Sequence, residues 1–253
     1  MTDEARDHAY SPSRFARDVA ATLARQAAEG GEQVARLRPL ELADADEPAT
    51  RLDLFLPEGE GPWPLMAFIH GGYWQELDHT ATDFLAERYL ARGMAFASLG
   101  YGLAPATPLE AMAAQCARGL AMARAALDER GGVGPVSLGG HSAGAQLACR
   151  VADEGGARVD ALLLVSGVFD LTPLVGTYIN APLALDRARA GALSPMFADL
   201  SALPRCRVVI AEHDPPALRR QGSDFVAALH AAGREAVLVD LPGCDHFDVL
   251  DRL

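Results

Sequence analysis

Short apolar runs alternate along the chain with longer segments in which apolar residues recur every three or four positions. Several of the runs are apolar at every position, as in strands whose two faces are both buried. The expected strands are residues 52–56, 65–69, 94–98, 136–138, 161–165, 207–211 and 236–241. This alternation predicts an α/β fold with a mostly parallel central sheet flanked by helices.

Helices are expected between the strands. The clearest covers residues 108–130, with apolar side chains at spacings of three and four and a glycine pair after it. It starts with the letters TPLE, which predict Thr107 as the N-cap and Glu110 as its capping-box partner. Further helices are expected over residues 12–30, 83–92, 142–153 and 216–232, the first of them ending at Gly30–Gly31.

The first part of the chain completes the expected sheet. Residues 34–56 contain two strand-like runs around the acidic turn ADADEPA, which predicts an antiparallel hairpin at one sheet edge and about eight strands in all. Residues 1–33 are expected to form an N-terminal helical segment. The irregular segment 172–202 is rich in Pro and Gly, and we expect it to form a cap over a pocket. Without a repeat or a linker, residues 1–253 are expected to form one domain.

Composition narrows the classes of partner and compartment. A net charge of −12 disfavours nucleic acid and anionic membranes as partners, and no apolar run approaches the roughly 18 residues of a membrane span. The four cysteines form no CxxC pair, and the first residues do not resemble a secretory signal. We therefore expect free thiols and a cytoplasmic protein, either a monomer or a homodimer.

A candidate nucleophile follows the expected strand at 136–138. Residues 140–144 read GHSAG, a G-x-S-x-G motif between a strand and a helix, and this context makes Ser142 the expected nucleophile. Small flanking residues allow the tight turn from which the serine oxygen projects. The alternative role for Ser142 is an ordinary helix N-cap in a glycine-rich turn.

A serine nucleophile needs a base and a group that orients the base. In chains with this motif the order is Ser, acid, His. Asp214 and His246 each follow an expected strand, so we predict Asp214 as the acid and His246 as the base. The alternative acids are Glu212, Asp245 and Asp170, and the neighbouring His213 is expected to be an ordinary loop residue.

The segment IHGGYW, residues 69–74, offers a site for the negative oxygen that forms when a carbonyl is attacked. Glycine lets the backbone approach a substrate closely. We expect the N–H groups of Gly71, Gly72 and Ala143 to form this oxyanion hole, with His70 bracing the loop. The alternative is a simple Gly-Gly turn at a strand end. No metal-binding or phosphate-loop motif occurs in the sequence, so no metal and no cofactor are expected.

Together these motifs resemble the α/β-hydrolase fold, in the HGG-type branch that includes hormone-sensitive-lipase-like esterases. The letters HGGYWQ resemble the signature of the kynurenine formamidases (arylformamidases). Six further segments resemble the same family and occur in the same order along nearly the whole chain. They are YSPSR, YGLAP, GHSAGAQLA, LLLVSGVFDLTPLV, EHDPPALRRQGSDF and DHFDVL. The chain ends seven residues after His246, earlier than is usual in the family, so we expect the base to be packed by neighbouring elements or by a partner subunit.

The resemblance implies hydrolysis of N-formyl-L-kynurenine to L-kynurenine and formate through a formyl group on Ser142. The aryl leaving group needs a flat apolar slot, for which Tyr73, Trp74, Phe169 and Tyr178 are the candidates. Asn180 is a candidate hydrogen-bond partner for the amino-acid end of the substrate. Alternatively, Trp74 packs under its loop, and Asn180 has a structural role in which it shapes the loop that contains it.

Two other function classes stay open at this point. A carboxylesterase acting on small aryl or short-acyl esters would share the triad and differ in its slot. A binding protein could keep the fold without catalysis. Measured turnover of a formamide and an aryl ester separates the formamidase from the carboxylesterase. The effect of Ser142→Ala separates both enzymes from the binding protein.

Overall fold

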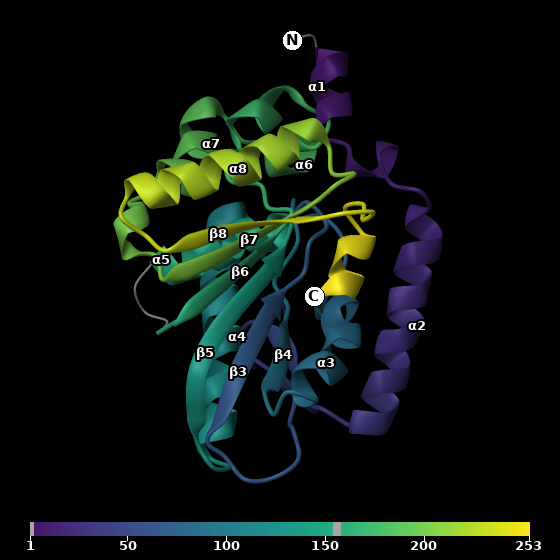
Figure 1. Cartoon of the computed structure of the whole chain (residues 1–253), viewed down its shortest axis with the longest axis vertical. Coiled ribbons are helices and arrows are strands. Elements are labelled where there is room, and N and C mark those ends of the chain that lie inside the picture. The colour runs from purple at the N-terminus through teal and green to yellow at the C-terminus, as the bar shows by residue number, and fades with distance from the viewer. Residues whose placement is uncertain (1–2, 154–157) are drawn as a thin grey trace.

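The computed structural model describes residues 3–153 and 158–253. Its centre is an eight-stranded sheet in the order β1-β2-β4-β3-β5-β6-β7-β8 (Figure 1). β1 and β2 pair antiparallel with each other, β2 pairs antiparallel with β4, and all other neighbours are parallel. The strands are β1 Leu40–Ala43, β2 Arg51–Phe55, β3 Trp63–Ile69, β4 Ala95–Leu99, β5 Val133–His141, β6 Ala161–Val165, β7 Arg205–Ala211 and β8 Ala236–Leu241.

Helices cover both faces of the sheet (Figure 1). One face carries α4, α5 and α8, and the other carries η2, α3 and η6, with α2 outside them. The α-helices are α1 Asp3–Ala9, α2 Val19–Leu37, α3 Ala86–Leu90, α4 Leu109–Asp128, α5 Ala143–Asp153, α6 Asn180–Leu183, α7 Arg187–Leu193 and α8 Pro216–Ala231. The 3-10 turns are η1 Pro12–Arg14, η2 His79–Leu85, η3 Thr172–Gly176, η4 Pro195–Phe197, η5 Leu200–Ala202 and η6 Asp248–Arg252.

The alternation of side chains along each strand divides the core into two layers. In β3, Leu65 and Ile69 join the cluster beneath α4 and α5, whereas Met66 and Phe68 join the cluster beneath α3 and η6. All four side chains are buried. A strand buried on both faces must be apolar at successive positions, which explains the continuous apolar runs in the sequence.

The expected α/β fold and the edge hairpin are confirmed, but the N-terminal boundaries were wrong. The structure has α1, η1 and then α2, which continues through Gly30–Gly31 to Leu37. Gly30 packs against η2, where an added Cβ would lie 3.4 Å from Phe84 N. Gln33 then hydrogen-bonds to Phe84 O and Glu87 N. Tertiary packing of α2 against η2 and α3 thus outweighs the helix-ending tendency of a glycine pair.

Other expected boundaries also shift. Helix α4 begins at Leu109 after Pro108, with no side-chain cap, so the capping box predicted for Thr107 and Glu110 was wrong. The Thr107 hydroxyl is turned toward Gly102 instead, where an added Cβ would lie 2.2 Å from it. The helix expected over residues 83–92 is split into η2 and α3.

The chain between β6 and β7 is built from short helical pieces, η3, α6, α7, η4 and η5. It lies at one end of the sheet, beside α1 and α8 (Figure 1). Its packing against α1 brings the N-terminal segment to the same end. In the described part of the chain, every helix is too short or too polar to span a bilayer.

Candidate active site

Ser142 occupies a strained turn between β5 and α5. Its φ of 53° lies in the left-handed region, which a non-glycine residue adopts only where the surroundings impose it. The turn is possible because its neighbours lack side chains: a Cβ on Gly140 would lie 2.2 Å from Gly144 O, and one on Gly144 would lie 2.2 Å from Ile69 O. The G-x-S-x-G motif therefore lies where it was expected, with Ser142 in the turn between the end of a strand and the start of a helix.

Asp214 and His246 meet at the same edge of the sheet. Asp214 follows β7, His246 follows β8, and the two side chains are joined by a hydrogen bond of 2.6 Å from Nδ1 of His246 to Oδ1 of Asp214. Both residues are buried, at 2% and 3% exposure. A donating Nδ1 leaves Nε2 of His246 as the nitrogen that can accept a proton.

Asp214 is held as a carboxylate. Burial alone would raise its pKa, but hydrogen bonds from His246, from the Ser166 hydroxyl and from the Ala211 N–H hold the pKa below its ordinary value. The Ser166 and Ala211 donors both contact Oδ2, at 2.5 and 2.8 Å. Ser166 was not among the residues expected from the sequence.

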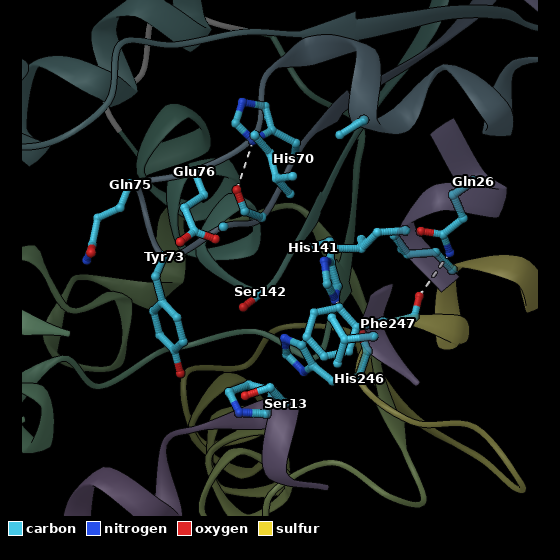
Figure 2. A pocket seen from close by; sticks show the side chains of 18 of the residues that line it. Ser13, Gln26, His70, Tyr73, Gln75, Glu76, His141, Ser142, His246 and Phe247 are labelled. Atoms are coloured by element: carbon cyan, nitrogen blue, oxygen red, sulfur yellow. Dashed lines mark hydrogen bonds between the residues drawn. The ribbon is translucent and has the colours of Figure 1, made fainter. Parts of the chain in front are cut away.

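Ser142 and His246 line one cavity of about 290 Å³. Figure 2 shows the Ser142 hydroxyl projecting into this cavity, with the His246 ring on one side of it. No hydrogen bond links the two side chains within the described residues; in unliganded active sites such contacts are often loose and shorten when substrate binds.

The three alternative acids are engaged elsewhere. Glu212 accepts a hydrogen bond from Gly243 N, and Asp170 accepts one from Thr172 N. Asp245 accepts from the backbone N–H groups of Arg17 and Phe247. These bonds shape loops, whereas Asp214 is the carboxylate in contact with the His246 ring.

The glycine pair lies directly against the serine turn. A Cβ on Gly71 would lie 2.9 Å from Nδ1 of His141 and 3.4 Å from Cβ of Ser142. Gly72 has a φ of +96°, and a Cβ there would lie 2.2 Å from Glu76 O. Both glycines line the cavity, and Ala143 is the first residue of α5. The backbone of this loop can therefore approach a ligand at Ser142 without a side chain between them.

His70 is held by the loop that it precedes. Its Nδ1–H donates to Gly71 O at 2.8 Å, and its ring stacks on Tyr101 with the centroids 4.3 Å apart. The Tyr101 hydroxyl donates in turn to His70 O and Gly71 O. Burial lowers the pKa of His70 to about 4, so the ring is neutral at neutral pH. These contacts fit the bracing role expected for His70.

His141, the residue before the serine, supports the base. Its Nε2–H donates to the carbonyl oxygen of His246 at 2.8 Å. Burial and the adjacent His246 lower the pKa of His141 to about 3, so it remains a neutral donor. The bond ties the His246 loop to the serine turn. In the sequence this histidine is only the variable position of G-x-S-x-G, so nothing there marked it.

The five expected substrate-contacting residues divide into two groups. Tyr73 and Tyr178 line the cavity. Trp74 is fully buried behind the loop and donates its indole N–H to Gln146. Phe169 is fully buried and stacks on Phe225, while the Asn180 amide bonds to backbone groups around α6. The expectation that Trp74, Phe169 and Asn180 contact substrate is therefore corrected, because each is occupied in packing or in loop structure.

The N-terminal segment forms a wall of the cavity that the sequence did not reveal. The wall residues are Pro12, Ser13, Val19, Leu23 and Gln26. Tyr10 O accepts a hydrogen bond from the Tyr73 hydroxyl, and Gln26 donates to Phe247 O, next to His246. His246, the candidate base, is thus packed by neighbouring elements of the same chain. The sequence signals in this segment were the letters YSPSR, which include Pro12 and Ser13, and the expected helix over residues 12–30. Neither signal says what the segment faces.

Comparison with known proteins identifies the fold and the relatives of this chain. A family model described as the alpha/beta hydrolase fold matches residues 66–249. The kynurenine formamidase of Danio rerio is 31% identical, over 96% of this chain and 89% of that protein. The crystal structure of a candidate thioesterase from Silicibacter sp. is 30% identical, with a TM-score of 0.84 over 97% of this chain and 93% of that one.

A more distant structure shares the fold alone. An esterase of Pyrobaculum calidifontis is 22% identical, with a TM-score of 0.75 over 100% of this chain and 92% of that one. The family model covers well over half of the chain, and the formamidase relative is matched almost end to end. The chain belongs to the α/β-hydrolase fold family, in the group that contains the kynurenine formamidases.

Proposed function

We propose that this chain hydrolyses the formamide of N-formyl-L-kynurenine to L-kynurenine and formate, with Ser142 as nucleophile, His246 as base and Asp214 as orienting acid. The observation that carries the proposal is the 2.6 Å bond between His246 and Asp214, which share the sheet edge with the strained Ser142. The relatives named as kynurenine formamidases support the choice of substrate.

In the proposed mechanism His246 Nε2 takes the hydroxyl proton as Ser142 Oγ bonds to the formyl carbon. The tetrahedral intermediate then breaks its C–N bond, and His246 returns the proton to the leaving aryl nitrogen. This leaves a formyl ester on Ser142. Water, deprotonated by His246, attacks that ester and releases formate. Asp214 holds the ring orientation and stabilises the imidazolium that forms in each step.

The same geometry offers donors for the developing oxyanion. In our proposal these are the N–H groups of Gly71, Gly72 and Ala143. Gly71 approaches the serine turn so closely that a side chain would collide with it, and Ala143 stands at the N-terminal end of α5, where the helix dipole favours negative charge. A donor of this kind contributes about 3–4 kcal/mol to the transition state.

The cavity fits a small aromatic substrate. Its volume of about 290 Å³ is at the lower end of the range for small-molecule sites, roughly 300–1,000 Å³. Tyr73 and Tyr178 offer aromatic surface in the same cavity as Ser142. A formyl group is the smallest acyl group that the serine could carry. Burial raises the pKa of the Tyr73 hydroxyl, so it stays protonated and bonded to Tyr10 O.

The test is to give the purified protein N-formylkynurenine and to measure formate and aryl amine separately. Equal amounts of both products, lost in Ser142→Ala, support the proposal. A short-chain aryl ester is assayed in parallel. Rapid ester turnover without any formamide turnover would replace the proposed function with that of a carboxylesterase.

We further infer a reducing compartment and a small-molecule partner. All four cysteines are buried and free, as expected where thiols stay reduced. The net charge of −12 is unsuited to binding nucleic acid or anionic lipid. Whether a homodimer forms is tested by the mass of the protein in solution.

A further inference from the structure

A single carboxylate faces the cavity on the side away from the base. Glu76 lines the cavity, and Figure 2 shows its carboxylate turned inward near Tyr73, with His246 on the far side of Ser142. The backbone of Glu76 is fixed by a hydrogen bond from its N–H to Gly72 O at 3.0 Å. The position of this side chain is therefore tied to the glycine loop next to the reacting serine.

The Glu76 side chain is exposed, and among the described residues no hydrogen bond or ion pair involves its carboxylate oxygens. Exposed arginines elsewhere on the protein do pair with acids. The described cavity lining contains no Arg, and the chain contains no Lys. The lining histidines His70 and His141 are neutral, since burial lowers their pKa values to about 4 and 3. The third lining histidine, His246, is hydrogen-bonded to Asp214. Glu76 thus brings to the cavity a solvent-exposed negative charge that no Arg or Lys of the described lining balances.

The surroundings of Glu76 suit a primary ammonium group. Tyr73 and Tyr178 line the same cavity, and an aromatic ring face also attracts a cation, although more weakly than a carboxylate does. We propose that Glu76 binds an ammonium group on the leaving-group side of the substrate, so that the site selects aryl formamides with an aminoalkyl side chain. This inference rests on the proposed function and specifies its substrate class.

The same charges make a prediction about the other end of an amino-acid substrate. A substrate carboxylate would find no Arg or Lys in the described lining and would be repelled by Glu76. We therefore infer that the α-ammonium is recognised and the α-carboxylate is dispensable. The decarboxylated analogue of N-formylkynurenine, an N-formyl aminoketone, should be cleaved at least as well as the amino acid itself.

Three formamides test the inference with the full-length protein. They are N-formylkynurenine, its decarboxylated amine and its desamino acid, which keep the reacting group and change only the charges. Relative to N-formylkynurenine, the wild-type protein should show a similar or lower KM for the amine. The KM for the desamino acid should be about three- to fivefold higher, as expected for loss of one solvent-screened ion pair.

Variants at Glu76 separate charge recognition from catalysis. Glu76→Gln should raise KM for both ammonium-bearing formamides about three- to fivefold while kcat changes less than twofold. Glu76→Asp should restore part of the affinity because it keeps the charge. The KM for neutral phenyl acetate should be unaffected. Glu58→Gln, which removes an exposed charge from the loop before β3, is the matched control and should change none of these values.

The outcomes distinguish the two proposals. If no formamide is cleaved, the proposed function fails, and an ammonium-bearing phenyl acetate then tests Glu76 against phenyl acetate itself. The inference is overturned if Glu76→Gln and Glu58→Gln behave alike toward ammonium-bearing substrates, or if the wild-type protein prefers the desamino acid. Thermal unfolding of each variant shows whether a KM change reflects loss of fold.

Discussion

Ser166 donates its hydroxyl to Oδ2 of Asp214 over 2.5 Å, while the other oxygen of the same carboxylate faces His246. Ser166 follows β6, has a φ of 48° and is fixed by a hydrogen bond from its backbone N–H to Val209 O. A short turn after one strand therefore orients the carboxylate that follows the next strand. Asp214 is held from two sides, by Ser166 and by His246.

This relationship predicts a shift in the pH profile of Ser166→Ala. Loss of the bond removes one of the interactions that lower the pKa of Asp214, so protonation of Asp214 should begin at higher pH. We expect kcat/KM to fall about three- to tenfold near neutral pH, and further on the acid side. A profile of kcat/KM against pH measures both effects. Ser223→Ala, on the exposed face of α8, is the control, and identical profiles for the two variants would contradict the role of Ser166.

Replacing Asp214 by Asn tests the orientation of the base. An asparagine keeps the shape of the side chain but loses the charge, and it can present an N–H to Nδ1 of His246, which favours the wrong tautomer. We expect kcat to fall by about 10⁴ with little change in KM, by analogy with serine hydrolases in general. Steady-state kinetics and circular dichroism of the variant measure activity and fold together. A loss smaller than tenfold would mean that another group orients His246.

Gly72→Ala should damage catalysis more than stability. The new Cβ would lie 2.2 Å from Glu76 O at a φ of +96°, so the backbone of the glycine loop, which lines the cavity at Ser142, must shift. We expect kcat to fall by about 10²–10³ if an oxyanion donor is displaced. Gly93→Ala is the matched control, because Gly93 also has a positive φ, +71°, but has no atom within 4 Å of an added Cβ. That control should lose about 1 kcal/mol of stability and keep its kcat; equal kcat for both variants would argue against the loop's role.

A buried carboxyl pair away from the cavity predicts a pH-dependent stability. Asp83 and Asp53 are 1% and 5% exposed, and Asp83 accepts a 2.5 Å hydrogen bond from Ser98. Burial, together with the nearby Asp53, raises the pKa of Asp83 to about 8. Between about pH 4 and 8 the folded chain keeps a proton that the unfolded chain releases, so the free energy of unfolding should fall as the pH rises through this range.

Asp83→Asn should therefore flatten the pH dependence. The amide is neutral at every pH. We expect the free energy of unfolding of the variant to exceed that of the wild-type protein by about 2 kcal/mol at pH 9 and to differ little from it at pH 5. Urea unfolding at the two pH values measures this, with the exposed Asp46→Asn as control. A wild-type protein that is as stable at pH 9 as at pH 5 would contradict the buried-proton account.

The sequence predicted those parts of the site that depend on strand ends. Ser142, Asp214 and His246 each follow a run of buried strand residues, and parallel strands bring their carboxyl ends to one edge. Chain order and spacing were therefore enough to expect that the three residues meet. Gly71 and Gly72 could be placed for the same reason, since they follow β3, the neighbour of β5.

The remaining parts of the site depend on packing between segments far apart in the chain. Trp74 looked like a pocket residue but is buried against Gln146 on α5. Ser166 and His141 act through single hydrogen bonds that no local pattern marks. The wall formed by residues 12–26 depends on how α2 docks, and the helix continues through a glycine pair because Gly30 is packed against η2.

The most direct measurement is the site and rate of labelling by a fluorophosphonate, which reacts far faster with an activated serine than with an ordinary hydroxyl group. We predict one label per chain, mapped by peptide mass spectrometry to Ser142, with hydrolytic activity lost in proportion to labelling. His246→Ala should slow the labelling by several orders of magnitude, because the serine then has no base. Labelling of a different residue, or full labelling of Ser142 with activity retained, would contradict the account.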